Sequence, residues 1–358
     1  MLKGIENNTI KPRSAILLST LGCNLRCKMC FHWQNKEEGI TRPTLKEWKD
    51  FIDSFSEVLN GGTGDDRFTI VFGGGEPLVF AEEVIELISF CTGRGYKTSL
   101  ATNGYLLDIA RLRRLINAGL NYVGLSLDSL DEVTHDYLRG VRGSYKKVME
   151  TLVRLKEFNK YIRIVINTII MAPNLDGIMK LVDYVRGKEH ISSILFQAIV
   201  QPFHTQVQED WQKKAEYSFL WPSDTKAVNY VIDRLIELKE TNGSLGKIDN
   251  SVSQLKAFKA YFENPDRFIK TLKCNAVESG FFTIGPDGSI NLCPYMESIG
   301  DIREGSLKSI WYSERALKTR EKMLNCRRNC HHLINCWFEE ELHEQKKDKC
   351  YFRSNQEM

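Results

Sequence analysis

The sequence predicts an α/β protein in which a parallel sheet is covered by helices and followed by a small metal-stapled domain. Six β-branched runs alternate with amphipathic segments between residues 14 and about 198, and six β-α units in a row give a parallel sheet, either open or curled into a barrel. The alternation of strands and helices ends near residue 200, and cysteines and turns dominate from Cys274 onward. We therefore expect a core at 1–200, a helical bridging or substrate region at 201–273, and a small domain at 274–358.

The expected strands are short runs rich in Ile, Val, Leu and Thr: Ala15–Thr20, Phe68–Phe72, Lys97–Ala101, Tyr122–Leu127, Ile162–Ile170 and Ser193–Ile199. Apolar residues recur at helical spacing between them, for example from Leu45 to Leu59. Thr44 followed by Glu47 predicts a capping box at the start of that helix, and Gly119 marks the end of a later one.

The composition excludes several classes of protein. The 358 residues are 42% apolar and 27% charged with a net charge of +3, which is typical of a globular chain and predicts neither a nucleic-acid nor a membrane partner. The longest apolar runs are too short to span a bilayer, and the residues from Met1 do not form a signal peptide. We expect a soluble, cytoplasmic protein.

Ten cysteines are unusual for a chain of this kind. Nine of them gather near the two ends of the sequence, and clustered cysteines in a reducing compartment bind metal more often than they form disulfides. The tenth, Cys91, lies on an apolar helix face and is interpreted as a buried small hydrophobe. The sequence therefore predicts two metal sites.

The first cysteine group lies directly after the first predicted strand. Cys23, Cys27 and Cys30 are separated by three and then two residues, which suits three corners of an iron–sulfur cluster or three positions around zinc, with His32 as a fourth zinc ligand. The carboxyl end of a first strand is also where parallel α/β domains place their active sites.

This CxxxCxxC segment resembles that of the radical S-adenosylmethionine (SAM) enzymes, and further elements recur in the order found in that family. They are Gly73-Gly74-Gly75-Glu76-Pro77 after the second strand, Thr102-Asn103-Gly104 after the third, Ser126-Leu127-Asp128 at the end of the fourth, His135-Asp136-Tyr137-Leu138-Arg139-Gly140, and Asn167 on the fifth. The resemblance covers residues 14–200 and implies a partial (β/α)6 TIM-like barrel. Taken singly, each of these elements has an ordinary structural interpretation as a turn, a strand end or a surface arginine.

The resemblance implies cofactor roles for these residues. A [4Fe-4S] cluster on Cys23, Cys27 and Cys30 would leave one iron for the amino and carboxylate groups of SAM. The segment Gly74, Gly75, Glu76 and Pro77 would hold the SAM amino group, Ser126 and Asp128 would point the same way and line the ribose, and Arg139 would pair with the carboxylate. Thr102, Asn103 and Asn167 complete the expected cofactor contacts.

The second cysteine group resembles the SPASM and Twitch extensions of the same family. Gly288–Cys293 matches their GxxxxC element, and Cys274 and Cys293 flank a predicted hairpin whose turn is Pro286-Asp287-Gly288. The resemblance implies at least one auxiliary cluster, preferably a single Twitch-like [4Fe-4S] cluster, with ligands drawn from Cys274, Cys293, Cys326, Cys330 and Cys336, and with Cys350 spare. Two clusters, or a zinc ribbon that includes His331 and His332, stay open as alternatives.

The function implied by the resemblance is reductive cleavage of SAM to a 5′-deoxyadenosyl radical that abstracts hydrogen from an unactivated carbon. Peptide or protein modification, such as the maturation of ribosomal peptides, is the preferred substrate class. Dehydrogenation or rearrangement of a small polyol, sugar or other metabolite is the alternative, and a non-catalytic electron carrier is a remote one. A reducing partner such as flavodoxin or ferredoxin is expected. The aromatic stretch Trp211–Pro222 is interpreted either as a lid or as a linker packed on the rim.

Overall fold

The structure is a computed structural model that describes residues 10–34, 37, 39–59, 67–202, 205, 209–272, 274 and 276–336. Six parallel strands form its centre, in the order in which they occur in the chain. They are β1 Ser14–Thr20, β2 Thr69–Gly74, β3 Lys97–Thr102, β4 Tyr122–Ser126, β5 Arg163–Ile170 and β6 Ser193–Ala198. All six predicted strands are present, with ends that differ from the prediction by at most two residues, and the predicted α/β barrel-type fold is confirmed.

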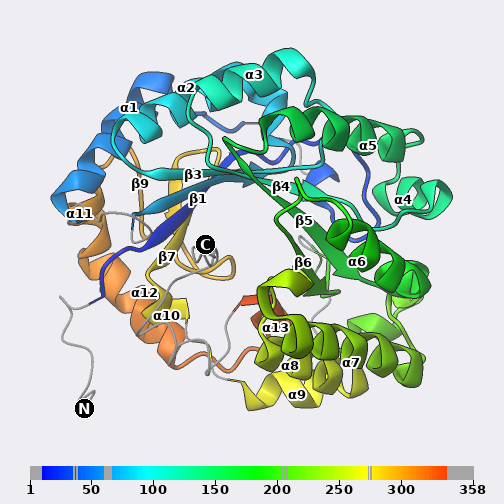
Figure 1. Cartoon of the computed structure of the whole chain (residues 1–358). Helices are drawn as coiled ribbons and strands as arrows, with labels where there is room; N and C mark the ends of the chain where they lie inside the picture. Colours follow the sequence, from blue (N-terminus) through cyan, green and yellow to red (C-terminus); the bar gives the residue numbers. More distant parts are fainter. Residues whose placement is uncertain are drawn as a thin grey trace.

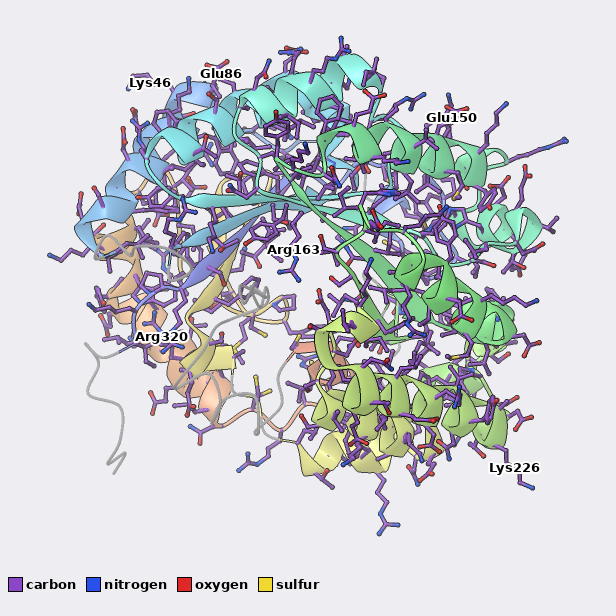
Figure 2. All side chains as sticks on the ribbon, in the orientation of Figure 1. Lys46, Glu86, Glu150, Arg163, Lys226 and Arg320 are labelled. Atoms are coloured by element: carbon purple, nitrogen blue, oxygen red, sulfur yellow. The ribbon has the colours of Figure 1, made fainter. Side chains whose placement is uncertain are left out.

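The helices of the first half lie on the outer face of the curved sheet (Figure 1). They are α1 Leu45–Asp53, α2 Ala81–Gly93, α3 Ile109–Asn117, α4 Glu132–Arg139, α5 Ser144–Leu155 and α6 Ile178–Arg186. The predicted capping box is present, because Thr44 accepts a hydrogen bond from the Glu47 backbone while Glu47 accepts one from that of Thr44. Gly119 follows α3 with a φ of +85°, a conformation that favours glycine. Charged side chains such as Lys46, Glu86 and Glu150 lie on this outer surface (Figure 2).

Side chains alternate along each strand between the buried layer under the helices and the interior of the barrel. Ala15, Leu17 and Phe72 point outward and are fully buried between sheet and helices. Their neighbours Ile16 and Val71 point inward and are only half-buried. The hydrophobic core therefore lies between the sheet and the helices, and the barrel interior is left as open space.

The bridging region is helical and aromatic. Its helices are α7 Thr225–Asn242, α8 Val252–Glu263 and α9 Pro265–Thr271, and the short 3₁₀ helices η7 Trp211–Lys213 and η8 Ser218–Leu220 precede them. The Trp221 ring packs edge-on against Trp211 and Tyr261 at 5.7 and 5.4 Å between ring centroids. Trp211 is fully buried, so this stretch is a packed wall of the molecule.

The C-terminal part continues the barrel sheet. Its elements are α10 Ala276–Ser279, β7 Phe281–Ile284, β8 Ser289–Asn291, β9 Gly300–Asp301, α11 Leu307–Trp311, α12 Glu314–Leu324 and α13 Leu333–Cys336. The predicted hairpin is present as β7 and β8, which pair antiparallel. In addition, β7 pairs parallel with β1, so one nine-stranded sheet runs β6-β5-β4-β3-β2-β1-β7-β8-β9 within the described residues. The local sequence pattern did not predict this pairing.

The far edge of the sheet, β6, is covered by asparagine side chains. The Asn250 amide accepts from the Phe196 N–H at 2.7 Å and donates to the Phe196 carbonyl at 2.8 Å. Asn335 makes the same pair of bonds with Ala198, both at 2.8 Å. The Lys247 carbonyl accepts from the Ile194 N–H, and the Asp249 N–H donates to the Ile194 carbonyl. Alternate residues of this edge strand are therefore paired without a further strand.

Replacing Asn250 with alanine should lower the free energy of unfolding by about 1–3 kcal/mol for each of the two Phe196 backbone groups left unpaired, because Asn250 is buried and water does not replace it. Urea unfolding followed by fluorescence measures the change. Asn242→Ala is the matched control, since that side chain makes one 3.2 Å bond to Leu238 at the end of α7. Equal losses in the two variants would contradict the role of Asn250.

Candidate active site

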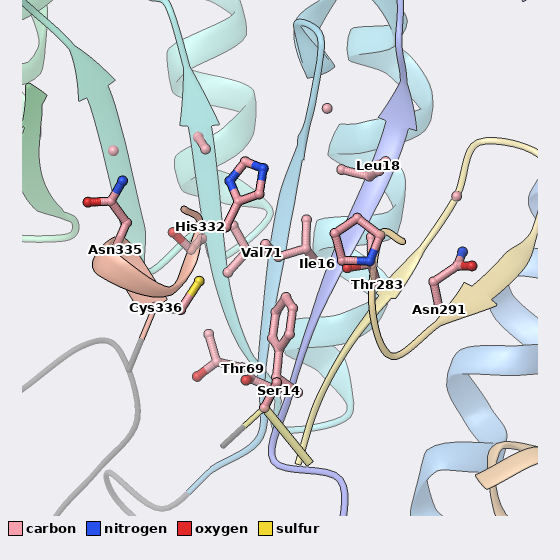
Figure 3. Close-up of a pocket in the computed structure, with 18 of the residues that line it drawn as sticks. Ser14, Ile16, Leu18, Thr69, Val71, Thr283, Asn291, His332, Asn335 and Cys336 are labelled. Carbon is pink, nitrogen blue, oxygen red and sulfur yellow. The ribbon is translucent and has the colours of Figure 1, made fainter. Parts of the chain in front are cut away.

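A chamber of about 1800 Å³ occupies the barrel interior. Small inward-facing residues create it, because Ser99, Ala101 and Gly124 stand where a closed barrel would place large side chains. The cluster loop, defined as residues 21–30, borders the chamber at the carboxyl ends of the strands. Residues from both cysteine groups line the same space, and Figure 3 shows Cys336 and His332 facing Ile16 and Val71 of the barrel.

The three cysteines of the cluster loop lie together and line the chamber. Each is a free thiol. Burial raises the pKa of Cys23 to about 11 and that of Cys30 to about 12, and it raises the pKa of Cys27 as well. Cys27 also raises the pKa of Cys23 and of Cys30, so as a metal-free group these thiols stay protonated, and metal would bind in exchange for protons.

Hydrogen-bond donors already point at two of these sulfurs. The Leu25 N–H lies 3.4 Å from Cys23 Sγ, and Asn103 Nδ2 lies 3.9 Å from it. Arg139 Nη1 lies 3.9 Å from Cys27 Sγ. Donors of this kind stabilise thiolate, so the loop fits a cluster bound through three thiolates.

The glycine run Gly73–Gly75 packs against the cluster loop. The Gly75 N–H donates to the Thr20 carbonyl at 2.8 Å, and the Glu76 N–H donates to the Gly22 carbonyl at 2.9 Å. A Cβ on Gly75 would overlap the carbonyl oxygens of Leu21 and Gly22, and Gly74 has a φ of +122°. Gly74 and Gly75 also line the chamber. The run therefore holds the loop and presents backbone to the chamber at the same place.

Glu76 lies behind the lining of the chamber. Its carboxylate is fully buried and accepts hydrogen bonds from the Thr102 hydroxyl at 2.8 Å, the Asn103 N–H at 2.9 Å and the Leu78 N–H at 3.1 Å. Burial raises its pKa to about 7, against the lowering effect of these bonds. Glu76 and Pro77 are not among the lining residues, whereas Thr102 and Asn103 are. The Glu76 carboxylate thus fixes the end of β3, and its contact with SAM stays a prediction.

Ser126 and Asn167 stand opposite each other on β4 and β5 and both line the chamber. Gly124 makes room for Asn167, because a Cβ on Gly124 would lie 2.5 Å from Asn167 Nδ2. Asp128 does not point the same way as Ser126: it follows the end of β4, is fully buried, and is not part of the lining. Strand alternation predicts direction only within the strand, which explains this difference.

Arg139 pairs with Asp128 inside the protein. Its Nη2 lies 2.7 Å from Asp128 Oδ2, and the Asp128 side chain is 0% exposed. Arg139 also lines the chamber. The preceding motif residues are structural: His135 Nδ1 accepts from the Asp128 N–H at 3.3 Å, and Asp136 accepts from Ser144 and Tyr145 at the start of α5.

Aromatic side chains cover the cluster loop. Trp33 Nε1 donates to the Cys30 carbonyl at 2.8 Å, and Phe31 packs against Trp33 and Tyr217 with centroids 6.3 and 6.1 Å apart. The bridging region therefore contacts Phe31, the residue that directly follows the cluster loop.

The C-terminal cysteines that line the chamber come from three separate segments. Cys274 precedes α10, Cys293 follows β8, Cys330 lies in the turn before α13, and Cys336 ends α13; all four line the chamber. Burial raises the pKa of Cys336 to about 12, with smaller contributions from Cys330, Cys274 and Cys293. Four of the five predicted ligands thus line the same chamber.

The other predicted cysteines have different positions. Cys326 is not part of the lining but is close enough to raise the pKa of both Cys274 and Cys293. Cys350 lies outside the described residues. Cys91 is fully buried in α2, as its apolar setting predicted.

A buried polar network beside Cys330 was missed by sequence reasoning. His331 Nδ1 contacts the Tyr261 hydroxyl at 2.9 Å and Trp211 Nε1 at 3.4 Å, and His331 Nε2 contacts Asp266 at 3.1 Å. Asn329 donates to the same Asp266 carboxylate at 2.6 Å. These bonds fasten the cysteine turn to the bridging region. Their partners are 60 or more residues apart, so no local pattern indicates them.

The described cysteines of each group are not gathered around one point. In the part of the chain that the structure describes, no three His, Cys, Asp or Glu side chains converge closely enough to hold one metal ion. Thiolates that share a zinc ion all lie about 2.3 Å from it, whereas each thiolate of a [4Fe-4S] cluster binds a different iron.

Comparison with family models agrees with this geometry. Residues 17–185 match the radical SAM superfamily, and residues 274–337 match SPASM, an iron–sulfur cluster-binding domain. Residues 17–185 form a radical SAM domain. The protein is an enzyme with a C-terminal SPASM domain. Its cofactors are SAM, a [4Fe-4S] cluster and at least one auxiliary iron–sulfur cluster.

Two curated relatives match most of the chain. Fe-coproporphyrin III synthase of Methanosarcina barkeri is 25% identical over 82% of this chain and 71% of its own length. AdoMet-dependent heme synthase of the same organism is 25% identical over 85% and 83%. PqqA peptide cyclase of Granulibacter bethesdensis is 26% identical, over 49% of this chain and 45% of its own.

Solved structures share the fold. Native anSMEcpe with bound AdoMet and Cp18Cys peptide is similar with a TM-score of 0.61 and 20% identity, over 92% of this chain and 85% of that chain. Streptococcus suis SuiB bound to precursor peptide SuiA has a TM-score of 0.61 and 18% identity, over 87% of this chain and 68% of that chain.

In the described ranges, the chain has no helix whose length and apolar content would let it cross a bilayer.

Replacing Gly75 with alanine should displace the cluster loop, because its Cβ would meet backbone that has no room to move. We expect the purified, anaerobically reconstituted variant to lose about half or more of its iron. Gly73→Ala is the control, since a Cβ there meets only Ile16 Cγ2 at 3.6 Å, an ordinary contact. Equal iron contents in the two proteins would show that the close approach at Gly75 is not needed.

Replacing Glu76 with alanine leaves three donors without an acceptor and loosens the segment between the glycine run and β3. We expect the SAM dissociation constant to rise about ten- to a hundredfold, corresponding to roughly 1.5–3 kcal/mol. Equilibrium binding of SAM to the reconstituted protein measures it. Thr102→Val removes one of the three bonds and should have a smaller effect. Unchanged SAM affinity in Glu76→Ala would contradict this role.

Proposed function

We propose that this enzyme uses SAM-derived radical chemistry to modify a peptide or protein. The observation that carries the proposal is the size and lining of the chamber. At about 1800 Å³ it exceeds the roughly 300–1,000 Å³ of ordinary small-ligand pockets, so SAM leaves room for a large substrate. The amide side chains of Gln197 and Asn291 face the same space and match the hydrogen-bonding groups of a peptide backbone.

The first site supplies the radical. Cys23, Cys27 and Cys30 would hold three irons of a [4Fe-4S] cluster. When bound, the reduced cluster supplies the electron that cleaves SAM to methionine and a 5′-deoxyadenosyl radical, which takes hydrogen from the substrate. The chain's own residues position the cofactor and exclude water.

The SAM contacts divide into two layers. Gly74, Gly75, Ser126, Asn167 and the Thr102–Asn103 strand end would touch the cofactor, because they line the chamber. Glu76, Pro77 and Asp128 would act from behind, by fixing the segments that make contact. Arg139 is present in both layers, since it lines the chamber and also pairs with Asp128.

The second site would hold one auxiliary [4Fe-4S] cluster. Cys274, Cys293, Cys330 and Cys336 give four thiols that line the chamber, which is the number of ligands that one cluster needs. Cys326 lies beside them as a fifth candidate. A cluster here would lie across the chamber from the cluster loop. It would either accept an electron from the substrate or bind the substrate directly.

The reducing partner would be a small electron-transfer protein such as flavodoxin or ferredoxin. Arg26 and Lys28 are exposed on either side of buried Cys27, so the cluster loop reaches the surface here. Lys28 Nζ lies 5.4 Å from the ring of Tyr137, which is itself 49% exposed. This basic surface with an exposed aromatic ring suits an acidic partner.

A carboxylated tetrapyrrole is the second candidate substrate. The two relatives from Methanosarcina barkeri that match over 80% of the chain are named as a Fe-coproporphyrin III synthase and a heme synthase. The peptide class is supported by the peptides bound in the anSMEcpe and SuiB structures. The chamber is large enough for either.

Deuterium transfer discriminates the two classes. Cells of the source organism are grown in heavy water, and their extract is separated into a peptide fraction and a metabolite fraction. The holoenzyme with SAM and dithionite should form deuterated 5′-deoxyadenosine with the peptide fraction, and protease treatment of that fraction should abolish it. Deuterium from the metabolite fraction alone, or stimulation of SAM cleavage by Fe-coproporphyrin III, would overturn the peptide proposal.

Iron counts test the two sites. We expect about eight irons per chain, about four after replacing Cys23, Cys27 and Cys30 with alanine, and essentially none after also replacing Cys274 and Cys293. The first-site variant should form no 5′-deoxyadenosine. Cys91→Ala is the control and should keep all its iron, because Cys91 is buried away from the chamber lining. About eight irons left in the first-site variant would require two auxiliary clusters, and none would contradict the auxiliary site.

A further inference from the structure

We propose that the buried Arg139–Asp128 ion pair sets the reduction potential of the cluster on Cys23, Cys27 and Cys30. The proposal rests on the cluster ligands proposed above. It assigns Arg139 a role as a positioned charge beside Cys27, which the resemblance of its motif to a SAM-carboxylate contact did not imply.

The guanidinium is the nearer of the two charges to the cysteine. Arg139 uses one terminal nitrogen for Asp128, at 2.7 Å, and the other for Cys27 Sγ, at 3.9 Å. The guanidinium thus lies between the carboxylate and the sulfur and contacts both. The cysteine therefore experiences a positive charge that the carboxylate only partly cancels.

The pair is held rigidly. Asp128 Oδ1 accepts from the Ile169 N–H at 3.2 Å, and the Asp128 carbonyl accepts from Asn174 at 2.8 Å. The Arg139 carbonyl accepts from the Arg26 N–H at 3.1 Å, and the Leu138 carbonyl accepts from the Lys28 N–H at 2.8 Å. The residues on both sides of Cys27 are thus bonded to the same turn of α4 that carries the guanidinium, so its distance from Cys27 is fixed by backbone.

Burial gives this charge its effect. The side chains of Arg139 and Asp128 are 11% and 0% exposed, so water screens them little. Reduction adds one electron to the cluster, and a fixed positive charge beside a ligand sulfur stabilises the added negative charge. Arg139 should therefore raise the potential, and Asp128 should limit that rise. The neighbouring Arg26 binds the Cys23 and Leu25 carbonyls from an exposed position, where solvent screens its charge.

The test is a redox titration of the reconstituted holoenzyme without SAM, followed by electron paramagnetic resonance. The signal of the first cluster is the one that the variant lacking Cys23, Cys27 and Cys30 does not show. We expect a lower midpoint potential in Arg139→Gln, a higher one in Asp128→Asn, and values near that of the unmodified enzyme in Arg139→Lys and in the matched control Arg26→Gln. Omitting SAM separates this role from a contact with the SAM carboxylate.

Equal potentials in Arg139→Gln and Arg139→Lys, or a shift in Arg26→Gln as large as in Arg139→Gln, would overturn the proposal. Iron content is measured in every variant. If Arg139→Gln binds no iron, Asp128→Asn decides, and a lowered or unchanged potential there overturns it. If the signal persists without Cys23, Cys27 and Cys30, the proposed ligands are wrong, which is a distinct result.

Discussion

A six-stranded parallel barrel does not close, and this constraint shapes the rest of the molecule. It leaves two free strand edges and an interior without an opposite wall. The β1 edge is continued by β7, and the β6 edge is paired by Asn250, Asn335 and the backbone around Lys247. Each of these solutions comes from residues after 240, so the second half of the chain completes the first. Helix α13 covers the open side of the barrel, so the interior becomes the chamber.

The cluster loop depends on its neighbours for its shape. Its backbone bonds to the glycine run on one side and to the end of α4 on the other. Gly75 and Gly140 both lack a Cβ where one would overlap loop carbonyls, those of Leu21 and Gly22 in the first case and that of Arg26 in the second. Motif residues that resemble cofactor contacts therefore serve first to hold the loop, and only part of them face the chamber.

The sequence predicted the local features well. The strands, the capping box, the hairpin and the two cysteine groups follow from periodicity and spacing, and Ser126 and Asn167 face the chamber as their strands require. Glu76 and Asp128 lie behind the lining because they follow the ends of strands, where alternation no longer fixes direction. The β1–β7 pairing and the Asn335 and His331 bonds join segments far apart in the chain, and such contacts have no local signature.

Asn335 stands next to Cys336, so one residue completes the edge of the barrel and the next belongs to the auxiliary cysteines. Iron bound by the proposed auxiliary ligands would hold their segments together, and Asn335 with them. Filling the auxiliary site and sealing the open side of the barrel would therefore reinforce each other. Delivery of that cofactor would then also stabilise the β6 edge and the shelter of the chamber.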